Sequence, residues 1–218
     1  MSSVAELLTD CFQKNSKKTA LSFFRGNTLE TRISFQDLDV NSNKMANLFL
    51  KQGVKKSDNV VLLLDKSLVF IVAYIALQKI GAVCVPLNPG FKKSELTYLL
   101  NDAAPVLIIV SQELAGMIKQ IDPQLTCLEM DTKIPFQKIA FLNSYSNDLE
   151  KVNLLPDDPG LIIYTSGTTG NPKGAVLTQK NLVNDANNII RIWEISESDT
   201  LCHSLPLFHV HGLCFALH

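Results

Sequence analysis

Strand-forming and helix-forming segments alternate through the first half of the chain, and this alternation constrains the fold more than any other feature. The strand segments are short and almost continuously apolar, as in residues 60–64 (VVLLL). Such runs are typical of parallel strands that are buried on both faces of a sheet. The sequence therefore predicts an α/β fold, with a mostly parallel β-sheet flanked by helices. Expected strands are 59–64, 82–86, 106–110 and 125–130, and expected helices are 67–80, 94–103 and 112–120.

The segments before and after this unit have their own signals. Residues 20–35 alternate around the turn Gly26-Asn27, which predicts an N-terminal β-hairpin, and Ser34 can cap a helix over 35–52. Residues 131–159 are expected to be irregular, with one short element near Phe141. Beyond them we expect strands at 161–164, 175–178 and 200–204, a helix over 179–193 that Thr178 can cap, and the start of a final helix near the end of the chain.

The segment 165–174 (TSGTTGNPKG) follows an apolar strand and combines hydroxyls, glycines and one lysine. Glycines allow tight turns that bring backbone N–H groups close to an anion, and the hydroxyls and the lysine add further donors. Because ligands bind open α/β folds at the ends of strands, this loop is predicted to hold phosphate groups. The predicted phosphate ligands are Thr165, Ser166, Gly167, Thr168, Thr169, Gly170 and Lys173.

The loop differs from a Walker A loop, which has glycine before its lysine and a hydroxyl residue after it. Here Pro172 precedes Lys173 and Gly174 follows it, and the next residues form a strand pattern rather than a helix. We therefore do not expect the phosphates to lie at a helix N-terminus. A merely flexible Ser/Thr/Gly-rich loop is the simpler alternative, but the flanking strands and Pro172 argue against it.

Residues 164–174 (YTSGTTGNPKG) resemble the signature loop of the adenylate-forming superfamily, which includes acyl-CoA synthetases, adenylation domains of peptide synthetases and luciferases. Two further segments, 77–89 (LQKIGAVCVPLNP) and 205–213 (LPLFHVHGL), are similar to family segments and occur in the family's order. The resemblance favours the acyl-CoA synthetase branch, with a malonyl-CoA-synthetase-like enzyme as the preferred member.

This resemblance implies a ligase that acts in two steps. A carboxylic acid, either a fatty acid or a malonate-like acid, first reacts with ATP to give an acyl-adenylate and pyrophosphate, and coenzyme A then takes the acyl group. It implies ATP, Mg²⁺ and coenzyme A as cofactors or co-substrates. The family's adenine-binding segment and its C-terminal lid have no counterpart in this sequence. We therefore expect residues 1–218 to be the N-terminal portion of the large adenylation domain, without a complete set of catalytic residues and inactive alone.

All four histidines lie in the last sixteen residues, and Cys202 and Cys214 accompany them. His209 occupies the position that lies beside the acyl pocket in the resembled family, so His209 and, less strongly, His211 are predicted substrate-pocket residues. A zinc site is the alternative, but His209-x-His211 lacks the i, i+4 spacing of helical zinc sites. We therefore expect no metal site built from these side chains.

Composition limits the other classes of function. The net charge is −1 and lysine and arginine are scattered, so we expect no nucleic-acid partner. The N-terminus lacks a signal-peptide pattern, the longest apolar stretch is too short to cross a bilayer, and five cysteines without C-x-x-C spacing suggest neither disulfides nor a zinc ribbon. A cytoplasmic protein is expected.

Two alternatives remain open from the sequence. The first is an adenylation domain that activates an amino or aryl acid for a carrier-protein thiol. The second is a non-catalytic, truncated α/β module with a binding role. His209 argues mildly against amino-acid activation, because such relatives usually carry an aspartate near this position.

Overall fold

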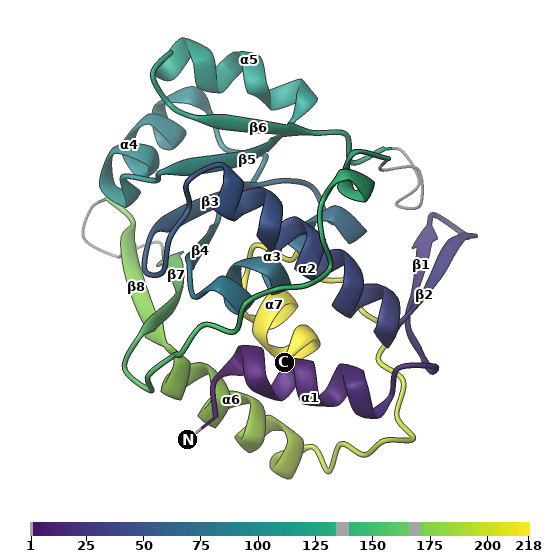
Figure 1. Ribbon diagram of the computed structural model, residues 1–218. Helices are drawn as coiled ribbons and strands as arrows, with labels where there is room; N and C mark the ends of the chain where they lie inside the picture. Colours follow the sequence, from purple (N-terminus) through teal and green to yellow (C-terminus); the bar gives the residue numbers. More distant parts are fainter. Residues whose placement is uncertain (1, 134–139, 166–170) are drawn as a thin grey trace.

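The computed structural model describes residues 2–133, 140–165 and 171–218 (Figure 1). Its centre is a six-stranded sheet with the order β6-β5-β3-β4-β7-β8. The pairs β6·β5, β5·β3, β3·β4 and β4·β7 are parallel, and only β7·β8 is antiparallel. The predicted mostly parallel α/β sheet is therefore confirmed. Its strands are β3 (Asn59–Leu63), β4 (Val83–Pro86), β5 (Leu107–Ser111), β6 (Cys127–Met130), β7 (Pro159–Thr165) and β8 (Lys173–Thr178).

The two faces of the sheet are covered by different helices. Because side chains alternate along a strand, Val61 and Leu63 of β3 pack with helices α4 (Lys93–Ala103) and α5 (Gln112–Ile121). Val60 and Leu62 belong to a second, larger cluster on the opposite face. That cluster contains residues of α1 (Val4–Lys14), α2 (Phe35–Lys51), α3 (Leu68–Ile80), α6 (Gln179–Ile192) and α7 (Val210–Leu217).

Helix α3 is the central element of this second layer, and every one of its residues is buried. Ser67 caps its start, and Gly81 ends it in the left-handed region with φ 70°. A side chain at Gly81 would also lie 2.5 Å from Leu154 Cδ2. The helix, its glycine stop and β4 together form the segment 77–89 that the sequence singled out, so this segment serves to pack a buried helix against the sheet.

Most predicted elements form with shifts of one or two residues. The hairpin appears as β1 (Thr19–Arg25) and β2 (Thr28–Ser34), and the short element near Phe141 is a 3-10 helix, η2 (Ala140–Ser144). Ser34 and Thr178 cap α2 and α6 through capping boxes, as their positions predicted.

Two expectations differ from the structure. The predicted strand over 200–204 is wrong, because these residues form an extended connection without strand pairing. Residues 201, 202, 204 and 205 are largely exposed there, so the alternating pattern lacks a neighbouring strand to pair with. Helix α1 was not predicted, although Ser3 and Glu6 form a capping box that marks its start.

A buried chain of amide side chains connects α1, α3, β7 and α6. Gln78 Nε2 donates to the Gly160 carbonyl at 2.9 Å, and Gln179 Nε2 donates to Gln78 Oε1 at 3.3 Å. The Val4 backbone N–H donates to Gln179 Oε1 at 3.1 Å. Both glutamine side chains are almost fully buried, so each bond compensates for lost hydration and fixes where β7 and α6 begin.

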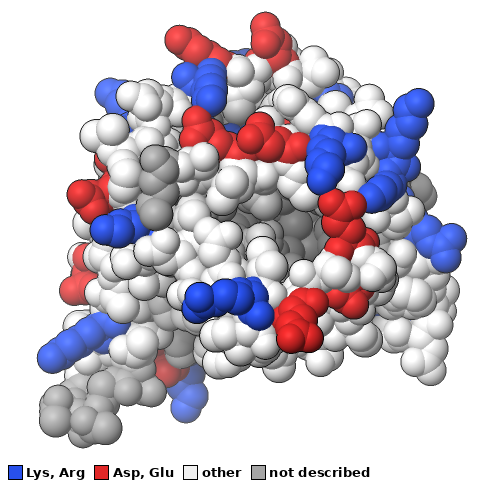
Figure 2. All heavy atoms as spheres, turned by 90° about the horizontal axis from the view of Figure 1, so that it is seen from below, with Lys and Arg blue, Asp and Glu red and all other residues white. Residues whose placement is uncertain are grey.

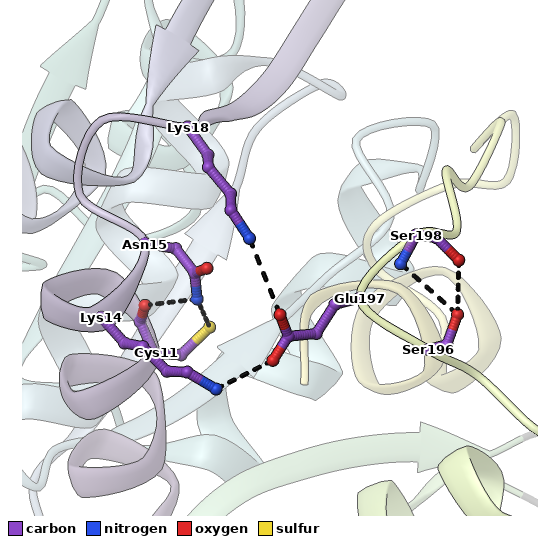
Figure 3. A network of polar contacts seen from close by, with 7 residues as sticks. All are labelled: Cys11, Lys14, Asn15, Lys18, Ser196, Glu197 and Ser198. Atoms are coloured by element: carbon purple, nitrogen blue, oxygen red, sulfur yellow. Dashed lines mark hydrogen bonds and ion pairs between the residues drawn. The ribbon is translucent and has the colours of Figure 1, made fainter.

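A second, exposed contact joins α1 to the chain after α6 (Figure 3). Glu197 accepts from Lys14 Nζ at 2.8 Å and lies 3.7 Å from Lys18 Nζ, while Ser196 and Ser198 form a local hydroxyl contact. The three charged side chains are 59–70% exposed, so we assign little stability to these pairs.

Across the described part of the chain, no helix is both long enough and apolar enough to span a bilayer.

Candidate functional site

The predicted phosphate loop connects β7 to β8, and its two described ends lie opposite one another. Thr165 is the last residue of β7 and Lys173 is the first of β8, and the two are paired across the antiparallel ladder. Both side chains are exposed. The other predicted ligands, Ser166, Gly167, Thr168, Thr169 and Gly170, lie outside the described residues. One predicted hydroxyl and the predicted cation are thus brought together at the open end of a strand pair.

Gly174 allows the two strands to pack closely at this point. A Cβ atom there would lie 2.9 Å from Ile162 Cγ2 and 3.4 Å from the ring of Tyr164, its partner across the ladder. The glycine that follows the lysine in the motif therefore serves strand packing. Sequence reasoning assigned it only a role in turning the backbone.

Two side chains of α4 contact both ends of the loop, and sequence reasoning missed them. The Tyr164 hydroxyl donates to Asp102 Oδ2 at 2.6 Å, and the Tyr98 hydroxyl donates to the Pro172 carbonyl at 3.1 Å. Burial and the adjacent Asp102 carboxylate raise the pKa of Tyr164, so its hydroxyl keeps its proton and remains a donor. These contacts span 62 and 74 residues of sequence, and no local pattern signals them.

The histidine segment leads into α7. His209 is the N-cap residue of this helix, although its side chain makes no capping bond, and its side chain is exposed. His211 is also exposed and lies edge-on to Phe215, with ring centroids 4.5 Å apart. The structure thus places both predicted pocket residues in the first turn of one helix, facing solvent.

The segment before His209 is held by a lysine from the β3–α3 connection. Lys66 Nζ donates to the His203 carbonyl at 2.5 Å and to the Leu205 carbonyl at 3.3 Å. Burial lowers the pKa of Lys66, and burial, together with the charge of the Lys66 ammonium group, lowers the pKa of His203. His203 therefore has a positioning lysine beside it, which makes it a poor candidate for a cationic pocket residue.

A cavity of about 360 Å³ lies between β8, α6 and α7. This volume falls in the range of small-molecule sites. The cavity brings the strand that begins with Lys173 next to the helix that begins after His209. Neither Lys173 nor His209 is itself part of the lining, which consists of Leu177, Asn181, Leu182, Asp185, Val210 and Cys214.

A smaller cavity of about 80 Å³ lies between α1 and α6, with His218 in its lining. Figure 2 views the molecule from the side of these helices and shows a hollow in this face, with side chains of both charge signs around it. On this face the basic side chains that are drawn are interspersed with acidic ones rather than gathered in one patch. Among the described residues, no three His, Cys, Asp or Glu side chains are arranged to hold a metal ion.

Among the four histidines, His218 is the one whose pKa departs most from its ordinary value. Its Nε2 lies 2.5 Å from the hydroxyl of the fully buried Tyr74, and its Nδ1 is buried without a partner. Burial lowers the pKa of His218 to about 4. The imidazole is therefore neutral in the folded chain at neutral pH, and its protonation opposes the packing of the end of α7 against α3.

Because of this histidine, we expect the free energy of unfolding to decrease as the pH is lowered. In the unfolded chain a histidine has a pKa of about 6.5, so between pH 6.5 and 4 the unfolded state binds the additional proton. The stabilisation is complete above pH 6.5 and decreases as the pH falls toward 4, by at most about 3 kcal/mol. Urea unfolding of wild type and His218→Phe at pH 7 and pH 4.5 measures this term. An equal decrease in both proteins would contradict it.

Comparisons with known proteins agree with the fold. Residues 8–218 match the family described as AMP-binding enzyme. A crotonobetaine/carnitine–CoA ligase from Citrobacter koseri is 31% identical over 229 residues, covering 97% of this chain and 43% of the relative. A dimodular nonribosomal peptide synthase from Bacillus subtilis is 32% identical over 172 residues, covering 79% of this chain and 7% of the relative.

Among solved structures, the ATP-bound MatB from Rhodopseudomonas palustris superposes with a TM-score of 0.85 and 28% identity. The match covers 98% of this chain and 42% of that protein. The chain thus spans less than half the length of each of these relatives.

Proposed function

Because the chain belongs to the family of AMP-binding enzymes, we propose that it carries the phosphate-binding part of an ATP-dependent acid–thiol ligase. The proposed reaction joins a carboxylic acid to the thiol of coenzyme A through an acyl-adenylate. Residues 1–218 are proposed to be the N-terminal portion of the large adenylation domain. The near-complete alignment of this chain with 43% of a CoA ligase supports this assignment.

One observation carries the proposal: Thr165 and Lys173 oppose each other at the mouth of the β7–β8 pair. An ammonium group and a hydroxyl that face the same space can bind one oxygen-rich anion from two sides. Both side chains are accessible, and within the described part of the chain Lys173 Nζ has no ion-pair or hydrogen-bond partner that would compete with a ligand. The pair therefore fits the triphosphate of ATP.

In the first step the carboxylate attacks the α-phosphorus of ATP and pyrophosphate leaves. Lys173 and Thr165 are proposed to bind the oxygens of the departing β- and γ-phosphates and to hold them in line with the attacked phosphorus. This is catalysis by orientation and electrostatic stabilisation, without a protein nucleophile. Mg²⁺, which neutralises part of the triphosphate charge, is proposed to enter with ATP, because oxygen-rich phosphate is its preferred partner.

The acid is proposed to bind on the side of α7. His209 stands at the N-cap of that helix, where an exposed imidazole can donate a hydrogen bond to a carboxylate, and His211 is the second residue of the helix. The cavity between β8, α6 and α7 connects this helix with the strand of Lys173. Leu177, Leu182, Val210 and Cys214 give it an apolar part suited to an acyl group, beside the polar side chains of Asn181 and Asp185. We propose a small carboxylic acid as the substrate.

Binding of nucleotide to the 218-residue chain tests the proposal. We expect isothermal titration to detect MgATP at millimolar concentration, and Lys173→Met to weaken its binding about tenfold, because a charge-assisted contact contributes about 1.5 kcal/mol. Lys17→Met removes an exposed lysine between α1 and β1 and serves as the matched control. Equal affinities of wild type and Lys173→Met would contradict the assignment.

The peptide synthase relative supports one second candidate, an adenylation domain that delivers its acid to a carrier-protein thiol. The two candidates differ in the thiol acceptor and share the ATP site. Both predict that the chain alone gives no carboxylate-dependent exchange of pyrophosphate into ATP. Robust exchange by the 218-residue chain would contradict that prediction.

A further inference from the structure

Helix α4 touches the phosphate-binding connection at both of its ends. Tyr164 is the residue before Thr165, and its hydroxyl donates to Asp102 Oδ2 at 2.6 Å. Pro172 is the residue before Lys173, and its carbonyl accepts from the Tyr98 hydroxyl at 3.1 Å. Tyr98 and Asp102 are four residues apart, so both lie on one face of the helix.

The symmetry of these contacts matters for the site. Each bond holds the residue directly before one of the two proposed phosphate ligands, and those ligands are paired across the ladder. Because the ladder ends at this pair, backbone pairing alone restrains only the strand side of Thr165 and Lys173. Restraint on the loop side of Thr165 and Lys173 must therefore come from contacts outside the ladder.

Helix α4 is itself a rigid support. Leu96, Leu99, Leu100 and Ala103 are buried in the core cluster on its side of the sheet, and at its start the Glu95 carboxylate accepts from the Lys92 backbone N–H at 2.8 Å. Tyr98 and Tyr164 are both partly buried and pack against that cluster. A hydroxyl on such a helix is positioned at low entropic cost, since its ring is already held by apolar contacts.

We propose that Tyr98 and Asp102, the α4 tether, are positioning residues that fix the two ends of the phosphate-binding connection and so set how Thr165 and Lys173 meet a polyphosphate. This role rests on the proposed function for its ligand, but its structural part is independent of any ligand. The tether restrains the strand ends without touching the bound phosphate.

Local hydrogen exchange tests the structural part. Tyr98→Phe keeps the ring and removes the donor, and Asp102→Ala removes the acceptor of Tyr164. In both variants we expect amide exchange in residues 161–165 and 173–177 to rise about fivefold, which corresponds to the loss of one hydrogen bond, while exchange in β3 and β5 stays unchanged. Asn101→Ala, on an exposed position of the same helix, is the control and should leave all these rates unchanged.

Binding of inorganic pyrophosphate tests the functional part. We expect Tyr98→Phe and Asp102→Ala to weaken pyrophosphate binding about fivefold, while the melting temperature falls by no more than about 4 °C. Asp102→Asn should recover most of the affinity, because the amide oxygen still accepts from the Tyr164 hydroxyl. Rescue by the conservative variant separates positioning from a general loss of stability.

The two readouts fail independently. Unchanged exchange at the strand ends in both variants, or an equal rise throughout the sheet, would overturn the α4 tether. A wild-type chain that binds no pyrophosphate would overturn the proposed function, and the exchange rates would still decide whether the tether exists. Weaker binding in the variants without rescue by Asp102→Asn would overturn the role of the Asp102 acceptor.

Discussion

Replacing Gly212 with alanine should lower the free energy of unfolding by about 3 kcal/mol, the upper range for overpacking a folded interior. A Cβ atom at this position would lie 1.8 Å from the Pro206 carbonyl oxygen and 2.7 Å from its carbonyl carbon. Both atoms belong to the backbone, so no side-chain rotation relieves the overlap. The segment 206–209 must shift away from α7, which also displaces His209 from the N-cap.

Urea unfolding measures this effect, and Gly116→Ala is the matched control. Gly116 lies inside α5, and a Cβ atom there would meet nothing within 4 Å. We expect the same substitution at Gly116 to stabilise the chain by about 0.5–1 kcal/mol, because alanine loses less backbone entropy in a helix than glycine does. Equal effects at the two glycines would show that the close approach of Pro206 to α7 is wrong.

Replacing Lys79 with methionine should destabilise the chain by about 3 kcal/mol, because it leaves a partly buried carboxylate without its cation. Lys79 Nζ donates to Asp39 Oδ1 at 2.6 Å and to Asn43 Oδ1 at 2.7 Å, and its side chain is only 5% exposed. Burial lowers the pKa of Lys79 more than the Asp39 carboxylate raises it. Burying this ion pair therefore costs free energy, and removing only one of its two partners costs more.

A double-mutant cycle with Asp39→Asn tests this directly. The double variant should be less destabilised than the sum of the single variants, with a coupling of about 1–2 kcal/mol, because the neutral amide no longer requires a cation. An exposed lysine contact on α2 provides the contrast: Lys44 Nζ donates to Asn143 Oδ1. Lys44→Met should change stability by less than about 0.5 kcal/mol. Additive effects at Asp39 and Lys79 would contradict the coupling.

Much of the fold could be predicted because its signals are local. The apolar run 60–64 indicated a strand buried on both faces, and Ser34 and Thr178 marked helix starts through side chains three residues from their partners. The prediction of a strand over 200–204 was wrong because strand formation does not depend on local signals alone. The residue pattern of this segment resembles a strand, but strand formation requires a neighbouring strand, which sequence alone does not reveal.

The site was predictable only in part. Thr165 and Lys173 could be recognised from the motif that contains them, and the ladder places them opposite one another. The hydrogen bonds of Tyr98, Asp102, Lys66 and Gln179 join residues that are 62 to 175 positions apart in the sequence, and such single bonds leave no periodic trace. For His209 and His211, the sequence allows the family position to be recognised, but it does not give the direction in which each side chain points.

The strand order also has a consequence for synthesis on the ribosome. Strand β4 ends at Pro86, but its second neighbour, β7, begins only at Pro159, after β5 and β6 have already joined the other side of β3. A nascent chain therefore carries one open edge of the sheet at β4 while more than half of the described strands are complete. Open edges can pair with other chains, and domains fold largely as units during synthesis. While residues 131–158 are being translated, the four completed strands of the sheet therefore have no partner for this edge.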